Sequence, residues 1–150
     1  MATNNLLQRL PTAGETFTNI AESHRRTVET FIAGGTITAG DWVAFATNKA
    51  EPAEKMIYVN RANSASSDTY LCAGVALNGA VANGRVEVCT SGIAEARVTN
   101  ALGAGNSLQI GTSVGEAIVY DPAGSGKMVG HNIDAGTGAT LCTVFVYKTL

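Results

Sequence analysis

Residues 83–88, NGRVEV, decide the fold class of this chain. Asn-Gly is a turn signal, and the Arg-Val-Glu-Val that follows alternates polar and apolar side chains with the period of a half-buried strand. Similar short runs, separated by Gly, Asn and Ala turns, recur about every ten residues. The other predicted strands are residues 27–33, 42–46, 56–59, 70–77, 93–98, 107–111, 117–120 and 141–147. The pattern predicts an all-β barrel or sandwich of about eight to ten short strands and favours no interior helix.

The composition limits the classes of protein to which the chain can belong. It has 150 residues, of which 15% are charged, and its net charge is −2. This balance argues against disorder, and also against a nucleic-acid binder, which needs a basic surface. No run approaches the roughly 18 apolar residues of a membrane helix, and no signal peptide is visible. We therefore expect a soluble β-domain with neither nucleic acid nor a membrane as its partner.

An apolar N-terminal arm, residues 1–25, precedes the predicted β-domain, residues 26–150. The arm is a short helix or an extended segment. In either form its apolar side chains need a surface to cover them, in their own subunit or in another molecule. The arm residues expected to make such contacts are Leu6, Leu7, Leu10, Phe17 and Ile20.

Ala-Gly-Asp/Asn turns open strands in both halves of the chain. Gly40-Asp41 and Gly105-Asn106 are the two copies, and a weaker version contains Gly84. Gly accepts a positive φ, and Asp or Asn closes the turn by bonding to nearby backbone. Because two copies are too few for a solenoid, we interpret them as recurring turn chemistry and not as a repeat architecture.

One signal of a serine hydrolase is present. Residues 111–115 match Gly-x-Ser-x-Gly, and Ser113, Asp121 and His131 follow the chain order of a hydrolase triad. A nucleophile elbow requires a helix after the serine, whereas residues 116–120 are strand-like. We therefore interpret the motif as a turn.

Two glycine-rich stretches resemble nucleotide-binding loops only in part. Residues 122–128 lack both the first glycine of a phosphate loop and the Ser or Thr that follows its lysine. Residues 103–105 lack the third glycine of a dinucleotide fingerprint. We predict no enzymatic activity and no cofactor.

The potential metal ligands are scattered along the chain. Cys72, Cys89 and Cys142 each stand among apolar neighbours, which predicts buried thiols in a reducing compartment. His24 and His131 do not complete a zinc site with them. His131 lies in a Gly-rich stretch and is expected in a solvated loop.

The order of several short motifs resembles one protein family. These are residues 35–43 (GTITAGDWV), 72–77 (CAGVAL), 83–94 (NGRVEVCTSGIA) and 104–108 (AGNSL). In this order they resemble the capsid cement, or head decoration, proteins of tailed bacteriophages. The resemblance covers about residues 30–120. In that family a Gly-Val pair recurs along the chain, and this sequence has Gly92-Ile93 where the second Gly-Val would stand.

The resemblance implies a small β-domain that assembles as a homotrimer on the outside of the expanded phage head. There it would bridge subunits of the major capsid protein, and it would be assembled in the host cytoplasm. The arm residues would then contact the capsid or a neighbouring subunit, or else pack on their own barrel. A tail or baseplate β-module is the first alternative. A carbohydrate-binding module is less favoured because the aromatic residues are dispersed.

Overall fold

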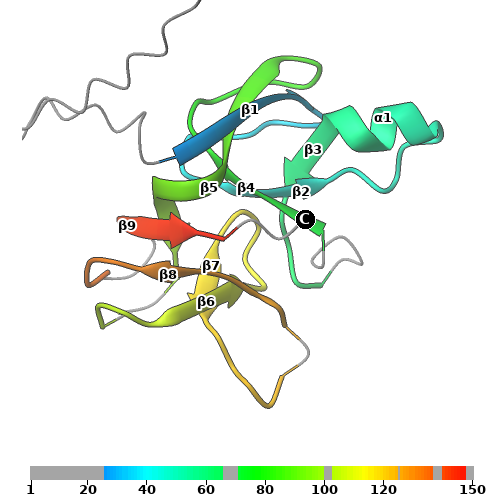
Figure 1. Ribbon diagram of the computed structural model, residues 1–150. Coiled ribbons are helices and arrows are strands. Elements are labelled where there is room, and N and C mark those ends of the chain that lie inside the picture. The colour runs from blue at the N-terminus through cyan, green and yellow to red at the C-terminus, as the bar shows by residue number, and fades with distance from the viewer. Residues whose placement is uncertain (1–25, 66–70, 100–102, 125, 137–139, 148–150) are drawn as a thin grey trace, which may run out of the picture.

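A computed structural model describes residues 26–65, 71–99, 103–124, 126–136 and 140–147. The predicted arm and its five contact residues lie outside these ranges. The described chain is all-β, as predicted, and it also contains one short helix (Figure 1). Its elements are β1 Arg26–Ala33, β2 Trp42–Phe45, α1 Pro52–Ile57, β3 Tyr58–Arg61, β4 Cys72–Ala76, β5 Arg85–Val98, β6 Ser107–Ile110, β7 Ala117–Val119, β8 Met128–Asn132 and β9 Thr140–Val146.

The strand pairings return on themselves twice. The strand order is β1-β3-β2-β4-β5-β7-β6-β8-β9, with additional pairings of β1 with β5 and of β5 with β9. The first half of β5 therefore closes a ring with β1 to β4, and its second half closes a ring with β6 to β9. We name these rings the first unit (residues 26–91) and the second unit (residues 92–147). Gly92, at the change from one ring to the other, has a φ of 104°, which favours glycine.

The two units have the same strand register. Trp42 pairs with Val75 between β2 and β4, and a bulge follows one residue later. Ser107 pairs with His131 between β6 and β8, and a bulge follows at the same place. The flanking pairs of β2 with β3 and of β6 with β7 are antiparallel in both units.

The turns before β2 and β6 are equivalent as well. The N–H of Gly40 donates to the carbonyl of Ala76, as the N–H of Gly105 donates to that of Asn132. The interpretation of the two turns as mere recurring turn chemistry is therefore wrong, because they belong to a tandem structural repeat. Backbone hydrogen bonds define this repeat, and the side chains around them mostly differ between the two units.

Each unit has its own hydrophobic core. Phe31, Val43, Val59, Val86 and Val88 are among the buried side chains of the first unit. The core of the second unit is larger because it also takes in side chains from the outer side of the first unit. Those contributed by the first unit are Trp42, Ala44, Ala62, Cys72, Val75 and Cys89.

Three local predictions need correction. No interior helix was expected, yet α1 forms where Pro52 and Glu54 occupy the first turn and Lys55 the last, each in a place that suits a helix. Met56 and Ile57 therefore lie in a helix and not in the strand predicted for residues 56–59. The separate strands at 85–88 and 93–98 are parts of one strand, β5.

The remaining correction concerns β8, which was not predicted. His131 lies on this strand and is half-buried, not solvated in a loop. Gly130 interrupts the apolar pattern because its backbone lies directly against the carbonyl of Phe145, where a Cβ would clash. The close approach of two backbones thus removed the sequence signal of a strand.

Candidate functional site

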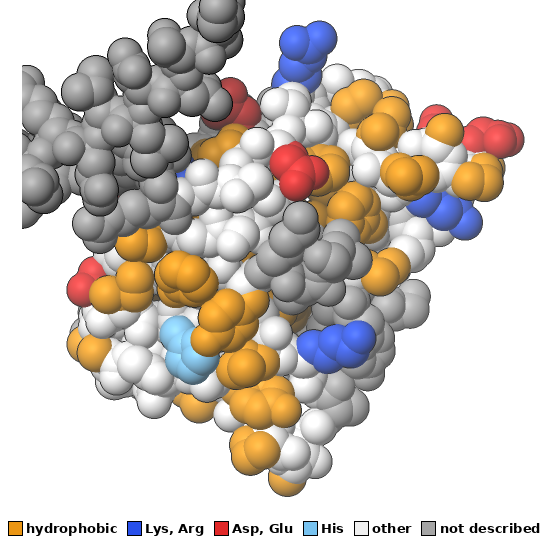
Figure 2. All heavy atoms as spheres, viewed as in Figure 1, with side chains coloured by type: hydrophobic (Ala, Val, Ile, Leu, Met, Phe, Trp, Pro, Cys, Tyr) orange, Lys and Arg blue, Asp and Glu red, His pale blue; other side chains and the backbone are white. Residues whose placement is uncertain are grey.

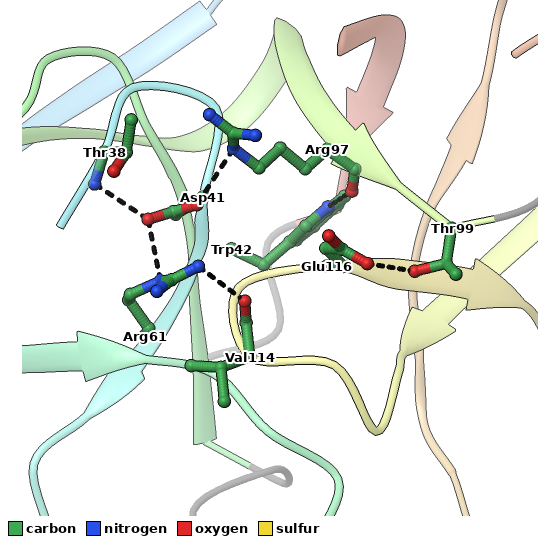
Figure 3. A network of polar contacts seen from close by, with 8 residues as sticks. All are labelled: Thr38, Asp41, Trp42, Arg61, Arg97, Thr99, Val114 and Glu116. Atoms are coloured by element: carbon green, nitrogen blue, oxygen red, sulfur yellow. Dashed lines mark hydrogen bonds and ion pairs between the residues drawn. The ribbon is translucent and has the colours of Figure 1, made fainter. Parts of the chain in front are cut away.

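A buried carboxylate lies at the junction of the two units (Figure 3). Asp41 is fully buried, and its Oδ2 lies 2.9 Å from Nε of Arg61 while its Oδ1 lies 3.1 Å from Nε of Arg97. The N–H of Thr38 donates to Oδ2 over 2.7 Å, which closes the turn before β2. Arg61 ends β3 of the first unit, whereas Arg97 lies on β5 in the second. The cluster therefore connects the two units by charge.

Trp42 adds hydrogen bonds to the same junction. Its indole Nε1–H donates to the carbonyl of Arg97 over 3.1 Å, and its backbone N–H donates to the carbonyl of Gly115 over 3.0 Å. Nη2 of Arg61 donates to the carbonyl of Val114 over 2.7 Å. Both of the last two acceptors lie in the turn between β6 and β7, so the second unit holds the start of β2 and the end of β3.

A second polar contact stabilises the same edge of the second unit. The hydroxyl of Thr99, just after β5, donates to the carboxylate of Glu116, just before β7 (Figure 3). Thus charges and polar groups at the junction are paired with one another. The cluster fits a structural role in fixing the two units.

The opposite side of the second unit carries a partly exposed row of side chains that includes two rings. Ser107 of β6, His131 of β8, Phe145 of β9 and Ile93 of β5 are consecutive cross-strand partners. Residues in direct register project to the same side of a sheet. We call these four residues the outer row. Phe145 is 41% exposed, and Figure 2 shows hydrophobic side chains gathered around the pale-blue histidine of this face.

Ring contacts hold the outer row in place. The rings of His131 and Tyr147 meet edge-on with centroids 5.2 Å apart, and Phe145 meets Tyr147 at 5.9 Å. The hydroxyl of Tyr147 also bonds to Nδ1 of His131, and Oγ of Ser107 lies 3.0 Å from its Nε2. Both ring nitrogens of His131 therefore contact protein groups, and the row presents an ordered aromatic surface.

The structure does not bring the residues of the hydrolase motif together as a triad. Residues 111–115 connect the antiparallel strands β6 and β7, so the serine is followed by a strand and not by a helix. Ser113 and Asp121 are exposed, while His131 bonds to Ser107 and Tyr147 instead.

Metal-binding and membrane-spanning features were also sought in the described ranges. There, no three His, Cys, Asp or Glu side chains are grouped so that they could hold a metal ion. No helix within those ranges is long and apolar enough to cross a membrane.

The predicted turn residues lie at the ends of strands. Gly40 and Gly105 have φ values of 86° and 83°, and the carbonyl of Asn106 accepts the N–H of Asn132. In the turn of Gly84 the positive φ belongs instead to Asn83, at 65°. Sequence reasoning identified Asp41 as a turn residue but missed its partners Arg61 and Arg97, because nothing in their sequence spacing signals the contact.

Cys72, Cys89 and Cys142 are all buried, as the sequence predicted. Burial raises the pKa of Cys72 to about 12, although a hydrogen bond with the backbone of Gly74 opposes the rise. Burial also raises the pKa of Cys89, although the positive charge of Arg26 and a backbone hydrogen bond at Ser91 oppose it. Both thiols are therefore protonated at neutral pH, as expected of small buried side chains.

Comparisons with known proteins identify the fold through structure and not through sequence. No protein-family model matches the chain, and no curated protein matches it. The head fiber gp8.5 N base of bacteriophage phi29 is similar with a TM-score of 0.58 and 15% identity, over 81% of this chain and 94% of that one. A chain from the capsid of Myoviridae phage XM1 is similar with a TM-score of 0.57 and 18% identity, over 100% of both chains. The chain therefore has a fold found in phage head and capsid structures, as its sequence resemblance predicted.

Proposed function

We propose that this protein is a structural component of a phage head that binds the outer surface of the expanded shell. In this role it bridges neighbouring subunits of the major capsid protein, acts without enzymatic chemistry and is assembled in the host cytoplasm. The observation that carries the proposal is the shared fold with the phi29 head fiber base and the XM1 capsid chain, each matched over nearly its whole length.

The architecture suits such a role. We propose that each ring of strands is a small five-stranded barrel and that three chains assemble into a homotrimer. A protein that binds only the assembled lattice stabilises it by mass action, without catalysis. Three linked copies also bind neighbouring capsid subunits with an effective concentration that separate copies lack.

The N-terminal arm is the proposed contact with the shell. Its apolar residues Leu6, Leu7, Leu10, Phe17 and Ile20 precede β1 directly in the chain. Anchors of this kind add contact area without changing the β-domain.

Binding to heads tests the proposal. The full chain is mixed with expanded heads that lack decoration, and bound protein is measured after sedimentation of the particles. We expect saturable binding and a higher temperature of DNA release. A chain without residues 1–25 should bind at least tenfold more weakly, which corresponds to a loss of about 1.4 kcal/mol.

Unexpanded heads and purified tails serve as controls. Binding to tails but not to expanded heads would overturn the proposal in favour of a tail or baseplate module. Equal binding by the full and shortened chains would overturn only the role of the arm.

A further inference from the structure

The outer side of the first unit is largely covered within the chain, while the equivalent side of the second unit is covered less. Trp42, Val75 and Cys89 form a cross-strand row in the first unit, and all three are 0% exposed. The shared register makes Ser107, His131 and Phe145 their counterparts in the second unit. Of these, Phe145 is 41% exposed. The outer row thus corresponds to the surface that is buried where the two units meet, but the described residues of the chain do not fully cover it.

The cover of the first row is the open end of the second unit. This end consists of Arg97 on β5 and the turn 111–115 between β6 and β7. It accepts the indole N–H and the backbone N–H of Trp42, through the carbonyls of Arg97 and Gly115. The N–H of Ser64 also donates to the carbonyl of Gly111. The contact is head to tail, because the outer side of one unit meets the strand ends of the next.

The first unit has an equivalent open end. Its connection between β2 and β3 occupies the place of the turn between β6 and β7, but it is longer and contains α1. Met56 and Ile57 on this helix are 72% and 46% exposed. Figure 1 shows α1 and the strands β6, β8 and β9 at opposite ends of the molecule. One chain therefore carries an unused outer row at one end and an unused apolar open end at the other.

We propose that the open end around α1 of one copy covers the outer row of a second copy. Met56 then packs near Phe145, in the kind of thioether–aromatic contact that proteins favour. This interface repeats between chains the head-to-tail contact that joins the units within a chain. Such heterologous contacts form a ring when the rotation closes. The inference rests on the proposed function for one feature only, the size of the ring, which is three chains. For that ring it identifies the two surfaces through which neighbouring chains meet.

Variants at both ends test the interface through the mass of the assembly. We expect the full chain at micromolar concentration to sediment at three times its 15.4 kDa. Phe145→Glu and Met56→Glu should each lower this mass threefold, because a charge at either end is desolvated in the interface. Val114→Glu is the matched control, since Val114 is 42% exposed and lies in the turn between β6 and β7, which belongs neither to the end around α1 nor to the outer row, and it should keep the wild-type mass. Far-ultraviolet circular dichroism checks that each variant is folded.

Cross-linking tests the head-to-tail direction. A flexible bismaleimide should join the double variant Met56→Cys/Phe145→Cys into a covalent trimer. Each single variant should remain a single chain on a denaturing gel, because in a ring like residues do not meet. The native thiols give a low background, since all three are buried.

The outcomes separate this inference from the proposed function. Any of three results would overturn the interface. These are cross-linking of either single variant, an assembly whose mass neither charged variant changes, and a monomeric wild type. Failure to bind expanded heads would overturn the proposed function. The interface would still be supported if the charged variants dissociate the assembly as described.

Discussion

Asp41 and Arg97 belong to different units of the repeat, yet Oδ1 of Asp41 lies 3.1 Å from Nε of Arg97. The second unit has no copy of this contact. By register, Asn106 stands in the place of Asp41 and Val119 in the place of Arg61. The ion pairs are therefore a property of the junction and not of the repeated fold.

Removal of this carboxylate should destabilise the whole chain. Asp41→Ala leaves two guanidinium groups without their counter-ion and the Thr38 N–H without its acceptor. We expect the free energy of unfolding to fall by about 3 kcal/mol. This value is at the lower end of the range for a broken buried ion pair, because both arginines are about one-third exposed. Urea denaturation measures the change. Glu95→Gln, on the exposed face of β5, is the control and should change the value by less than about 0.5 kcal/mol.

Trp42 reports the integrity of the junction. It is the only tryptophan in the sequence, and it is fully buried between the units. Its native fluorescence should be blue-shifted, and its denaturation midpoint should coincide with that of circular dichroism, because the units share a core. Trp42→Ala should lower the free energy of unfolding by about 3–5 kcal/mol. Two separate midpoints in the wild type would contradict the coupling of the units.

The sequence predicted the fold class because burial on one face imposes a period of two. That signal is clear in Arg85–Val88, where Val86 and Val88 are fully buried and Arg85 and Glu87 are exposed. It fails at β8, where close backbone approach requires Gly130 and ring contacts favour His131. Local patterns thus identify strands that pack through side chains better than strands that pack through backbone.

The junction could not be predicted for a different reason. Asp41 carries a turn signal that is complete without its partners, and Arg61 and Arg97 lie far from it in the sequence. The repeat was equally hidden, because its units share hydrogen bonds between backbone atoms and have few residues in common, such as Gly40 and Gly105 in the turns. Long-range contacts of this kind cannot be recognised from the spacing of residues in the sequence or from its composition.

Burial of the thiols predicts how the protein reacts with a disulfide reagent. At pH 8 the native protein should react slowly, since Cys72 has a pKa of about 12 and the pKa of Cys89 is raised. In denaturant all three thiols should react at once. Absorbance of the released thiolate measures both rates.

The same shift makes stability depend on alkaline pH. Above the ordinary thiol pKa of 9.0 the unfolded chain loses protons that the folded chain keeps. The contribution of Cys72 to stability should therefore be constant below pH 9 and fall as the pH rises from 9 toward 12. Cys72→Ala should flatten this dependence. An equal slope in the variant would contradict the assignment to Cys72.

Gly74 and Gly130 occupy equivalent positions of the repeat, and both should resist substitution. A Cβ at Gly74 would meet the carbonyl of Cys89, and one at Gly130 would meet that of Phe145. Because the obstacle in each case is backbone and not a flexible side chain, Gly74→Ala and Gly130→Ala should each lower the free energy of unfolding by about 3 kcal/mol. Gly35→Ala is the control, since no atom lies within 4 Å of its Cβ position, and it should be neutral or stabilising by up to about 1 kcal/mol. Thermal denaturation compares the three variants. A tolerated alanine at either equivalent position would show that the two units do not share the close backbone contact on which their common register depends.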